Sequence, residues 1–158
     1  MRSDQIRKRA LAGARERGLK LLARVLDGAS EAQIERRFGS APMQRALFAA
    51  MARAFDPDAA GGFEGRVGYE LSRPATGGQP LAWTIDVSAG RATVHRGLAP
   101  GAKLTLRLEL ADFMRVAAGT LDPVVPVLQG RASVLGDFGL AARLPQMFGA
   151  ARPRAGGA

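Results

Sequence analysis

The strongest constraint in this sequence is an alternation of apolar and polar residues between positions 66 and 110. In the run Leu81–Ser88 (LAWTIDVS) every second residue is a large apolar one, and the same period of two returns in 67–71 and 104–110. Because successive side chains of a strand point to opposite faces, each run predicts a strand with one apolar and one polar face. Such strands are typical of a mainly antiparallel sheet that is covered on one side only, since fully buried sheets have continuous apolar runs.

The apolar face of such a sheet has to be covered by helices. The candidate helical segments are 111–118, 123–128 and the stretch after Asp137, whose carboxylate can cap a helix. Pro145 lies inside the last segment and predicts a kink or a break there, because proline removes one backbone donor. Residues 146–148 would then form a separable flap that gates the movement of a ligand. The pattern therefore predicts an α+β fold with helices packed on one face of a sheet.

Three further helices are predicted before the sheet, each starting at a serine that can act as an N-cap: Ser3, Ser30 and Ser40. Gly61-Gly62 follows the last of them and marks the best internal boundary, because the period changes there from about 3.6 to 2. The predicted parts are a helical arm over residues 1–60 that packs on the domain, a domain over 61–149, and a disordered tail over 150–158.

Much of the net charge of +9 lies in the arm, because residues 1–62 hold 12 Lys and Arg against 7 Asp and Glu. Basic arms can bind anionic lipid or nucleic acid. The first helix has a basic side and an apolar side, and the apolar side consists of Ala10, Leu11, Ala14, Gly18, Leu21, Leu22 and Val25. This side has no aromatic residue, which favours packing on the domain, while a transient contact with an anionic membrane stays open. Nucleic acid is not expected as a partner, because the polar face of the sheet has balanced charges and no aromatic residues on which bases could stack.

Residues that could perform catalysis or bind a metal or cofactor form no recognisable motif. The chain has no cysteine, and its one histidine, His95, lies at a polar strand position. There is no G-x-S-x-G elbow, no Walker loop and no G-x-G-x-x-G pattern. The sequence thus predicts a protein that is not an enzyme and has no catalytic residue, metal or cofactor. No secretion signal or membrane-spanning stretch is recognised, so a cytoplasmic location is expected.

Three segments of the second half together resemble one family: LAWTIDVSAGRATV, KLTLRLELADFMRVAAGTLDP and VLQGRASVLGDFGLAARLPQMF. The order and spacing of Asp112-Phe113, Gly119, Pro123, Gln129-Gly130 and Gly136-Asp137 are similar to those of the sterol carrier protein 2 (SCP-2) sterol-binding domain, in a bacterial-type single-domain member. The likeness runs from about residue 63 to residue 148. It implies a five-stranded sheet with helices on one face, around an apolar tunnel.

The resemblance implies non-catalytic binding, and transfer inside the cell, of fatty acids, fatty acyl-CoA, sterols or other lipids. An alternative stays open, in which an accessory or scaffold protein holds a lipophilic intermediate, such as a prenylated quinone precursor, for a partner enzyme. Gln129 matches a family glutamine that lies near the tunnel, and the residues after Asp137 match the helix that closes it. The residues expected to contact the lipid are Trp83, Ile85, Leu106, Phe113, Met114, Ala117, Val124, Leu128, Gln129, Leu140, Leu144, Met147 and Phe148.

Overall fold

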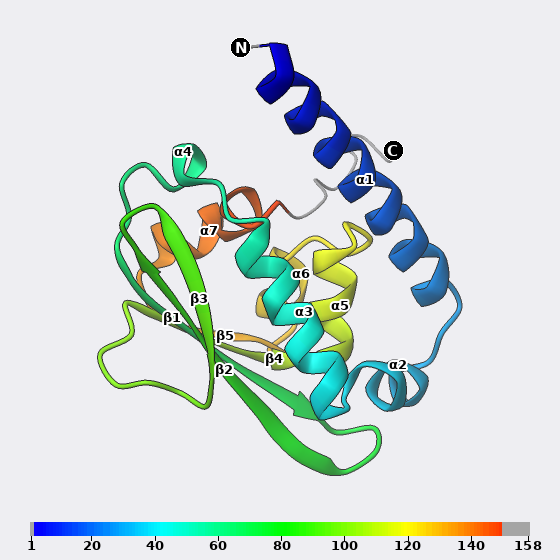
Figure 1. Cartoon of the computed structure of the whole chain (residues 1–158). Helices are drawn as coiled ribbons and strands as arrows, with labels where there is room; N and C mark the ends of the chain where they lie inside the picture. Colours follow the sequence, from blue (N-terminus) through cyan, green and yellow to red (C-terminus); the bar gives the residue numbers. More distant parts are fainter. Residues whose placement is uncertain (1, 150–158) are drawn as a thin grey trace.

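A computed structural model describes residues 2–149 and contains a five-stranded sheet with helices on one side (Figure 1). The strands are β1 (Gly65–Arg73), β2 (Gly78–Ser88), β3 (Arg91–Arg96), β4 (Leu104–Glu109) and β5 (Ser133–Gly136). They lie side by side in the order β3-β2-β1-β4-β5, with β1 and β4 parallel and the other neighbouring pairs antiparallel. The predicted α+β fold, with a mainly antiparallel sheet covered on one face, is therefore confirmed.

The alternating apolar positions of the strands form the inner face of the sheet. Tyr69 of β1 lies opposite Trp83 of β2, and Val67 lies opposite Ile85. Leu104 of β4 lies opposite Val67 on its other side, and all five residues are at most 4% exposed. Burying one large apolar side chain contributes about 1.5–3 kcal/mol, so this face supplies much of the free energy that holds the helices on the sheet.

The chain crosses the outer face of the sheet between β3 and β4, because β4 joins the far side of β1. In this crossing, the Thr84 hydroxyl donates to the Gly97 carbonyl oxygen at 2.7 Å and accepts from the Ala99 amide at 2.9 Å. A Cβ at Gly68 would come within 3.1 Å of Leu98 Cδ2, so glycine leaves room for the crossing loop. Thr84, which the alternation assigns to the polar face, is therefore fully buried.

Two helices before the sheet begin at the predicted serine caps, whereas Ser3, which was also predicted as a cap, lies inside helix α1 (Arg2–Leu26). Helix α2 (Glu31–Phe38) has a capping box, in which the Gln33 amide donates to Ser30 Oγ at 3.2 Å and the Ser30 amide donates to Gln33 Oε1 at 2.9 Å. Helix α3 (Ala41–Arg53) begins after Ser40, whose hydroxyl accepts from the Met43 amide. A short helix α4 (Pro57–Ala60) then leads into β1.

The boundary predicted near residue 60 does not separate two hydrophobic cores. Ile34 of α2 and Phe48 of α3 are at most 1% exposed and belong to the same cluster as the inner face of the sheet. The part expected to be a disordered tail, residues 150–158, lies outside the described residues.

Three helices follow β4 in the sequence: α5 (Leu110–Ala117), α6 (Val124–Leu128) and α7 (Phe138–Met147). Gly136 joins β5 to α7 with a φ of 112°, and a Cβ there would lie 2.3 Å from the Lys103 carbonyl oxygen, so this turn requires glycine. The Asp137 carboxylate then caps α7 by accepting from the Leu140 amide at 3.0 Å, as predicted. Pro145 does not break the helix, because α7 continues to Met147.

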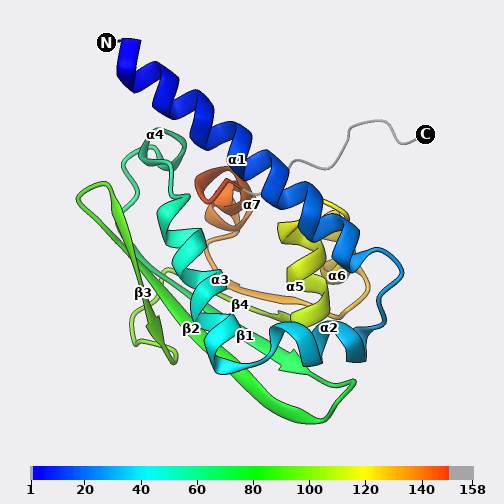
Figure 2. The same ribbon diagram turned by 45° about the vertical axis from the view of Figure 1, so that its right-hand side comes forward.

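Helix α1 (Arg2–Leu26) runs across the helical layer and extends beyond it (Figures 1 and 2). Only its last turns contact the core, through the buried Leu26 and the partly buried Leu22 and Ala23. Leu11 and Leu21, on the side that was expected to pack on the domain, are 69% and 61% exposed. Of the apolar side that was expected to pack on the domain, Leu22 makes this contact, whereas Leu11 and Leu21 do not.

Candidate functional site

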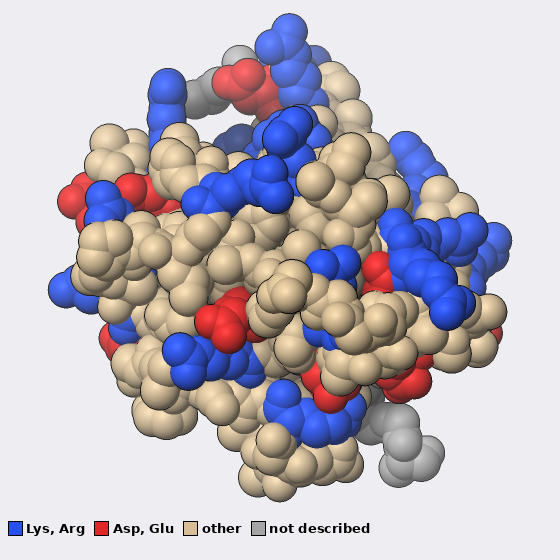
Figure 3. Space-filling model, turned by 90° about the horizontal axis from the view of Figure 1, so that it is seen from below, with Lys and Arg blue, Asp and Glu red and all other residues tan. Residues whose placement is uncertain are grey.

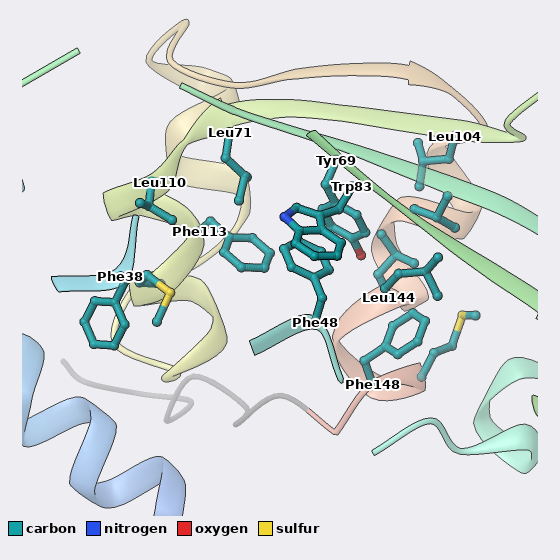
Figure 4. Packing of buried hydrophobic residues seen from close by; sticks show 14 of the residues in the cluster. Phe38, Phe48, Tyr69, Leu71, Trp83, Leu104, Leu110, Phe113, Leu144 and Phe148 are labelled. Carbon is teal, nitrogen blue, oxygen red and sulfur yellow. The ribbon is translucent and has the colours of Figure 1, made fainter. Parts of the chain in front are cut away.

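A cluster of aromatic rings fills the centre of the space between the sheet and the helices (Figure 4). Phe48 of α3 stacks on Trp83 of β2, with ring centroids 4.9 Å apart, and on Phe113 of α5, at 5.7 Å. Tyr69 of β1 meets both phenylalanine rings edge-on, at 5.5 and 5.7 Å. All four residues are at most 8% exposed. Elements from both halves of the chain therefore meet at one group of rings.

The residues predicted to contact a lipid fall into two groups. Those that are buried in the core are Trp83, Ile85, Phe113, Met114, Leu140, Leu144, Met147 and Phe148. Leu106 and Ala117 are partly buried beside them. Val124 and Leu128 of α6 are 55% and 78% exposed, and Gln129 is also exposed, so the structure does not bring these three into the core. Lipid contact stays a prediction for both groups.

Gln129 belongs to a polar cluster with Arg131 and Asp112. Arg131 Nη2 donates to Gln129 Oε1 at 2.6 Å, and Arg131 Nη1 donates to the two Asp112 carboxylate oxygens at 2.7 and 3.0 Å. The Asp112 side chain is fully buried, whereas that of Arg131 is 34% exposed. This ion pair ties α5, which carries Phe113, to the segment that leads into β5.

The charge of this cluster acts on Glu109, the last residue of β4. Burial and the nearby Asp112 carboxylate raise the pKa of Glu109 above its ordinary value, and the Arg131 guanidinium lowers it in part. Glu35 of α2 is a second buried acidic residue among residues 2–149. Burial also raises the pKa of Tyr69 above its ordinary range, so its hydroxyl is neutral in the ring cluster.

Phe48, Tyr69 and Gln44 are among the interior residues that are absent from the predicted set. Tyr69 carries a usable signal, because the alternation in β1 places it on the apolar face. Phe48 is harder to find, since Gln44 occupies the same buried side of α3 one turn earlier and interrupts the apolar pattern. Gln44 is 1% exposed; its Nε2 donates to the Phe38 carbonyl oxygen at 2.7 Å, while its Oε1 has no hydrogen-bond partner in residues 2–149.

Two surface depressions lie away from the ring cluster. One, of about 570 Å³, is at the corner between α1 and α2 and is lined in part by Val25, Arg36 and Arg37. The other, of about 510 Å³, borders the β1–β2 loop and is lined in part by Glu35 and Arg73. Neither depression lies in the space between the sheet and the helices, where the resemblance implies a tunnel and where buried apolar side chains gather.

The end of α7 is held against the segment between α3 and α4. The Asp56 amide donates to the Met147 carbonyl oxygen at 2.7 Å, and the rings of Phe148 and Phe55 lie 5.6 Å apart. Met147 is fully buried and Phe148 is 6% exposed. Residues 146–148, expected to form a flap, are therefore packed in this conformation, and gating by them stays a prediction.

The buried acidic residue Glu35 has a structural role. The buried Glu35 carboxylate accepts from the Ala75 and Thr76 amides, at 3.0 and 2.9 Å, and so anchors the β1–β2 loop to α2.

Within residues 2–149, no three histidine or acidic side chains come together in a way that could hold a metal ion. No helix in the same range is long and apolar enough to cross a membrane.

Comparison with models of protein families shows to which family the chain belongs. The model of a family described as the SCP-2 sterol transfer family matches residues 47–149, which is more than half of the chain. The chain belongs to this family. The match begins in α3 and runs through α7, so the SCP-2 domain includes Phe48 together with the sheet that Phe48 packs on. The resemblance carried by the three sequence segments is thereby confirmed.

The similar proteins include one of about the length of the matched region and others that are several times longer. Hydroxysteroid dehydrogenase-like protein 2 of Xenopus laevis is 26% identical over 112 residues, which is 70% of this chain and 25% of that protein. Apo sterol carrier protein 2 of Yarrowia lipolytica has a TM-score of 0.52 at 15% identity, over 65% of this chain and 89% of that one. The sec-alkylsulfatase Pisa1 of Pseudomonas sp. has a TM-score of 0.51 at 22% identity, over 65% of this chain and 15% of that one.

These structural likenesses show the fold alone, because the identities are low. The chain spans a quarter or less of the length of the curated relatives it matches. The SCP-2 family supports lipid binding or transfer as a class of function, whereas the enzyme activities belong to the longer relatives.

Proposed function

We propose that this protein binds a hydrophobic ligand between its sheet and its helices α3, α5 and α7, and transfers or presents it without catalysis. The observation that carries the proposal is the content of this space, which consists of aromatic rings and flexible apolar side chains such as Met114 and Met147. Methionine adapts its shape easily, so a core of this kind can repack around a guest. Membership of the SCP-2 family supports the same class of function.

Burial of apolar ligand surface can supply enough binding free energy without hydrogen bonds or ion pairs to the ligand. Burying one methylene group contributes about 0.8 kcal/mol, so ten methylenes would contribute on the order of 8 kcal/mol before the costs of ordering and repacking. Fatty acids, fatty acyl-CoA and sterol-like lipids all carry enough apolar surface. We propose them as the ligand classes to test, and a cytoplasmic location stays a prediction.

Helix α1 supports a transient contact with an anionic membrane, from which a lipid would be loaded. The helix carries eight Lys and Arg against two Asp and Glu, while Leu11, Leu21 and Val25 are exposed on one side. An exposed apolar stripe flanked by cations is the pattern of helices that lie in a lipid interface. On the face seen from below in Figure 3, Lys and Arg form separate groups with Asp and Glu nearby, so that face does not favour nucleic acid.

A second candidate is an accessory role, in which the protein holds a lipophilic intermediate, such as a prenylated quinone precursor, for a partner enzyme. The observation that favours it is the similarity to segments of longer proteins, including a dehydrogenase-like protein and an alkylsulfatase. In this role, α1 would contact the partner enzyme instead of a membrane.

The main experiment is native mass spectrometry of the gently purified protein, followed by titration with fluorescent fatty acids of several chain lengths. We expect a co-purified lipid, or saturable binding that displaces it. A protein that is empty and binds no fatty acid of any length would refute the proposed function.

Removal of residues 2–18 separates the two roles of α1, because these residues lie before the turns that contact the core. The truncated protein should keep its ligand affinity and its circular dichroism spectrum. Loss of binding to phosphatidylglycerol vesicles supports the membrane contact, whereas unchanged vesicle binding contradicts it. Loss of a co-purifying enzyme, with vesicle binding intact, supports the accessory role.

A further inference from the structure

The stacked rings define the shape of part of the ligand. We propose that Phe48 is an internal plug, and that the ligand carries a planar unsaturated ring with a hydroxyl group that takes the place of the Phe48 ring. This inference rests on the proposed function, because it assigns a ligand class to the same interior site.

The first observation is the orientation of the rings in Figure 4. The Phe48 ring is inclined by only 12° to the Trp83 ring and by 8° to the Phe113 ring. Phe48 thus joins a ring of the sheet to a ring of α5 by two stacked contacts, while Tyr69 meets it edge-on. Stacked and edge-on ring pairs are stabilised beyond the apolar area they bury. Only another flat ring can restore both stacked contacts after the Phe48 ring has moved away, since an alkyl chain has no flat face.

The second observation is that Phe48 lies on a helix, whereas Tyr69 and Trp83 lie on strands. Phe48 is fully buried although it belongs to α3, whose opposite side, including Arg45 and Ala46, is exposed to solvent. The Trp83 and Tyr69 rings are fixed on central strands, which have hydrogen-bonded neighbours on both sides.

Phe113 also lies on a helix, but the pair between Asp112 and Arg131 ties α5 to the segment before β5. We therefore assign the movement to the Phe48 ring, whose displacement would open a slot next to the other three rings.

The third observation is the unpartnered oxygen of Gln44. Residues four apart on a helix lie on one face, so Gln44 stands one turn from Phe48 on the buried side of α3. Its Oε1 is buried and has no hydrogen-bond partner among the described residues, although its Nε2 is bonded to the Phe38 carbonyl oxygen. Buried carbonyl oxygens are nearly always paired in folded proteins. A carbonyl oxygen accepts a hydrogen bond, so the complementary ligand group is a donor, and a hydroxyl on the ring meets this requirement.

Trp83 provides a built-in reporter, because it is the single tryptophan of the chain and lies in the stack. The probes are β-naphthol, its methyl ether, and palmitic acid, which has a chain and no ring. Affinities are measured by calorimetry, and the emission of Trp83 is followed with palmitic acid and with a non-fluorescent phenol. We expect β-naphthol to bind at least about fivefold more tightly than its methyl ether, because only the naphthol donates to Gln44 Oε1.

Three variants test the assignment of each residue. Phe48→Ala removes the plug and should strengthen β-naphthol binding by about tenfold, because two ring contacts no longer have to be broken. Phe48→Leu keeps most of the apolar volume without a ring, and serves if the alanine variant does not fold. Gln44→Leu should make the affinities for β-naphthol and its methyl ether equal. Phe38→Ala is the matched control, since Phe38 is also buried, at 6% exposed, and lies outside the stack. The substitution keeps the Phe38 carbonyl oxygen that accepts from Gln44 Nε2, so naphthol affinity should be unchanged.

The outcomes separate this inference from the proposed function. Binding of palmitic acid, without binding of β-naphthol to the wild type or to either Phe48 variant, leaves the proposed function intact and overturns the planar-ring ligand. An equal gain in the Phe38 and Phe48 variants also overturns it, because any cavity would then suffice. Failure of every probe overturns both.

Discussion

The ion pair between Asp112 and Arg131 gives the sharpest test of how the site is held together. The perturbation is Arg131→Met, which keeps an apolar stem of similar length and leaves the Asp112 carboxylate without its partner. Because Asp112 is fully buried and loses contacts of 2.7 and 3.0 Å, it would be an unpaired charge in the interior. Breaking a buried pair in this way costs about 3–5 kcal/mol.

The expected loss is at the low end of this range, about 3 kcal/mol, because solvent reaches Arg131, whose side chain is 34% exposed. For a chain of this size, that loss corresponds to a fall in Tm of roughly 6–12 °C. The assay is urea denaturation followed by Trp83 fluorescence, with circular dichroism as a second probe of two-state unfolding.

The matched control is Arg66→Met, which breaks the pair between Arg66 and Asp86 on the outer face. Both side chains of that pair are partly exposed, at 44% and 30%, so the expected loss is below about 1 kcal/mol. The double variant Asp112→Leu, Arg131→Met should be more stable than Arg131→Met alone, because no unpaired charge remains. The reasoning is refuted if Arg131→Met is no more destabilising than Arg66→Met.

Three further predictions concern other parts of the fold. Glu109→Gln should stabilise the protein progressively more as pH rises through the raised pKa of Glu109, because the wild-type carboxyl group favours the folded state only while it is protonated. A difference between the urea midpoints of variant and wild type that does not change with pH would contradict this. Glu35→Ala should cost about 2–3 kcal/mol and increase hydrogen exchange at the Thr76 amide, since that amide and Ala75 lose their acceptor; unchanged exchange would show that the loop is held otherwise. Pro145→Ala should slow ligand exchange in stopped-flow measurements if residues 146–148 gate the site, and equal rates in a well-folded variant would exclude the gate.

The strands could be predicted from the sequence because one period accounts for them. Alternation fixes which side of a strand is buried whatever its neighbours are, so Trp83 and Ile85 were placed correctly. The outer face departs from the rule at Thr84, which is covered by the crossing loop. The contact between Thr84 and that loop is a tertiary contact, which no local sequence pattern predicts.

The helices were predicted well in extent and less well in orientation. Serine caps located the starts of α2 and α3, because capping is a local interaction. The buried side of α3 was obscured by Gln44, a polar residue inside the core. On α1, several sides carry apolar residues, so hydrophobicity alone could not show that Leu26 would be buried while Leu11 stays exposed.

The candidate site could be predicted only in part, because it depends on how the helices are oriented on the sheet. Membership of the SCP-2 family and the apolar inner face could be inferred from the sequence, whereas the filling of the interior by Phe48 depends on how α3 sits on the sheet. The exposure of Leu128 likewise depends on the position of α6, which a run of apolar residues does not determine.

The parallel pairing of β1 with β4 has a consequence for the order of folding. β1 can pair with β2 as soon as both have been synthesised, but its other edge has no partner until the chain reaches Leu104. A nascent chain that stops earlier therefore presents a long strand with unpaired backbone groups, which is a template for aggregation. Pairing of distant strands is also slow, because a long loop has to close first. We expect folding of this protein to depend on how quickly the ribosome delivers β4 after the β1–β2 hairpin has formed.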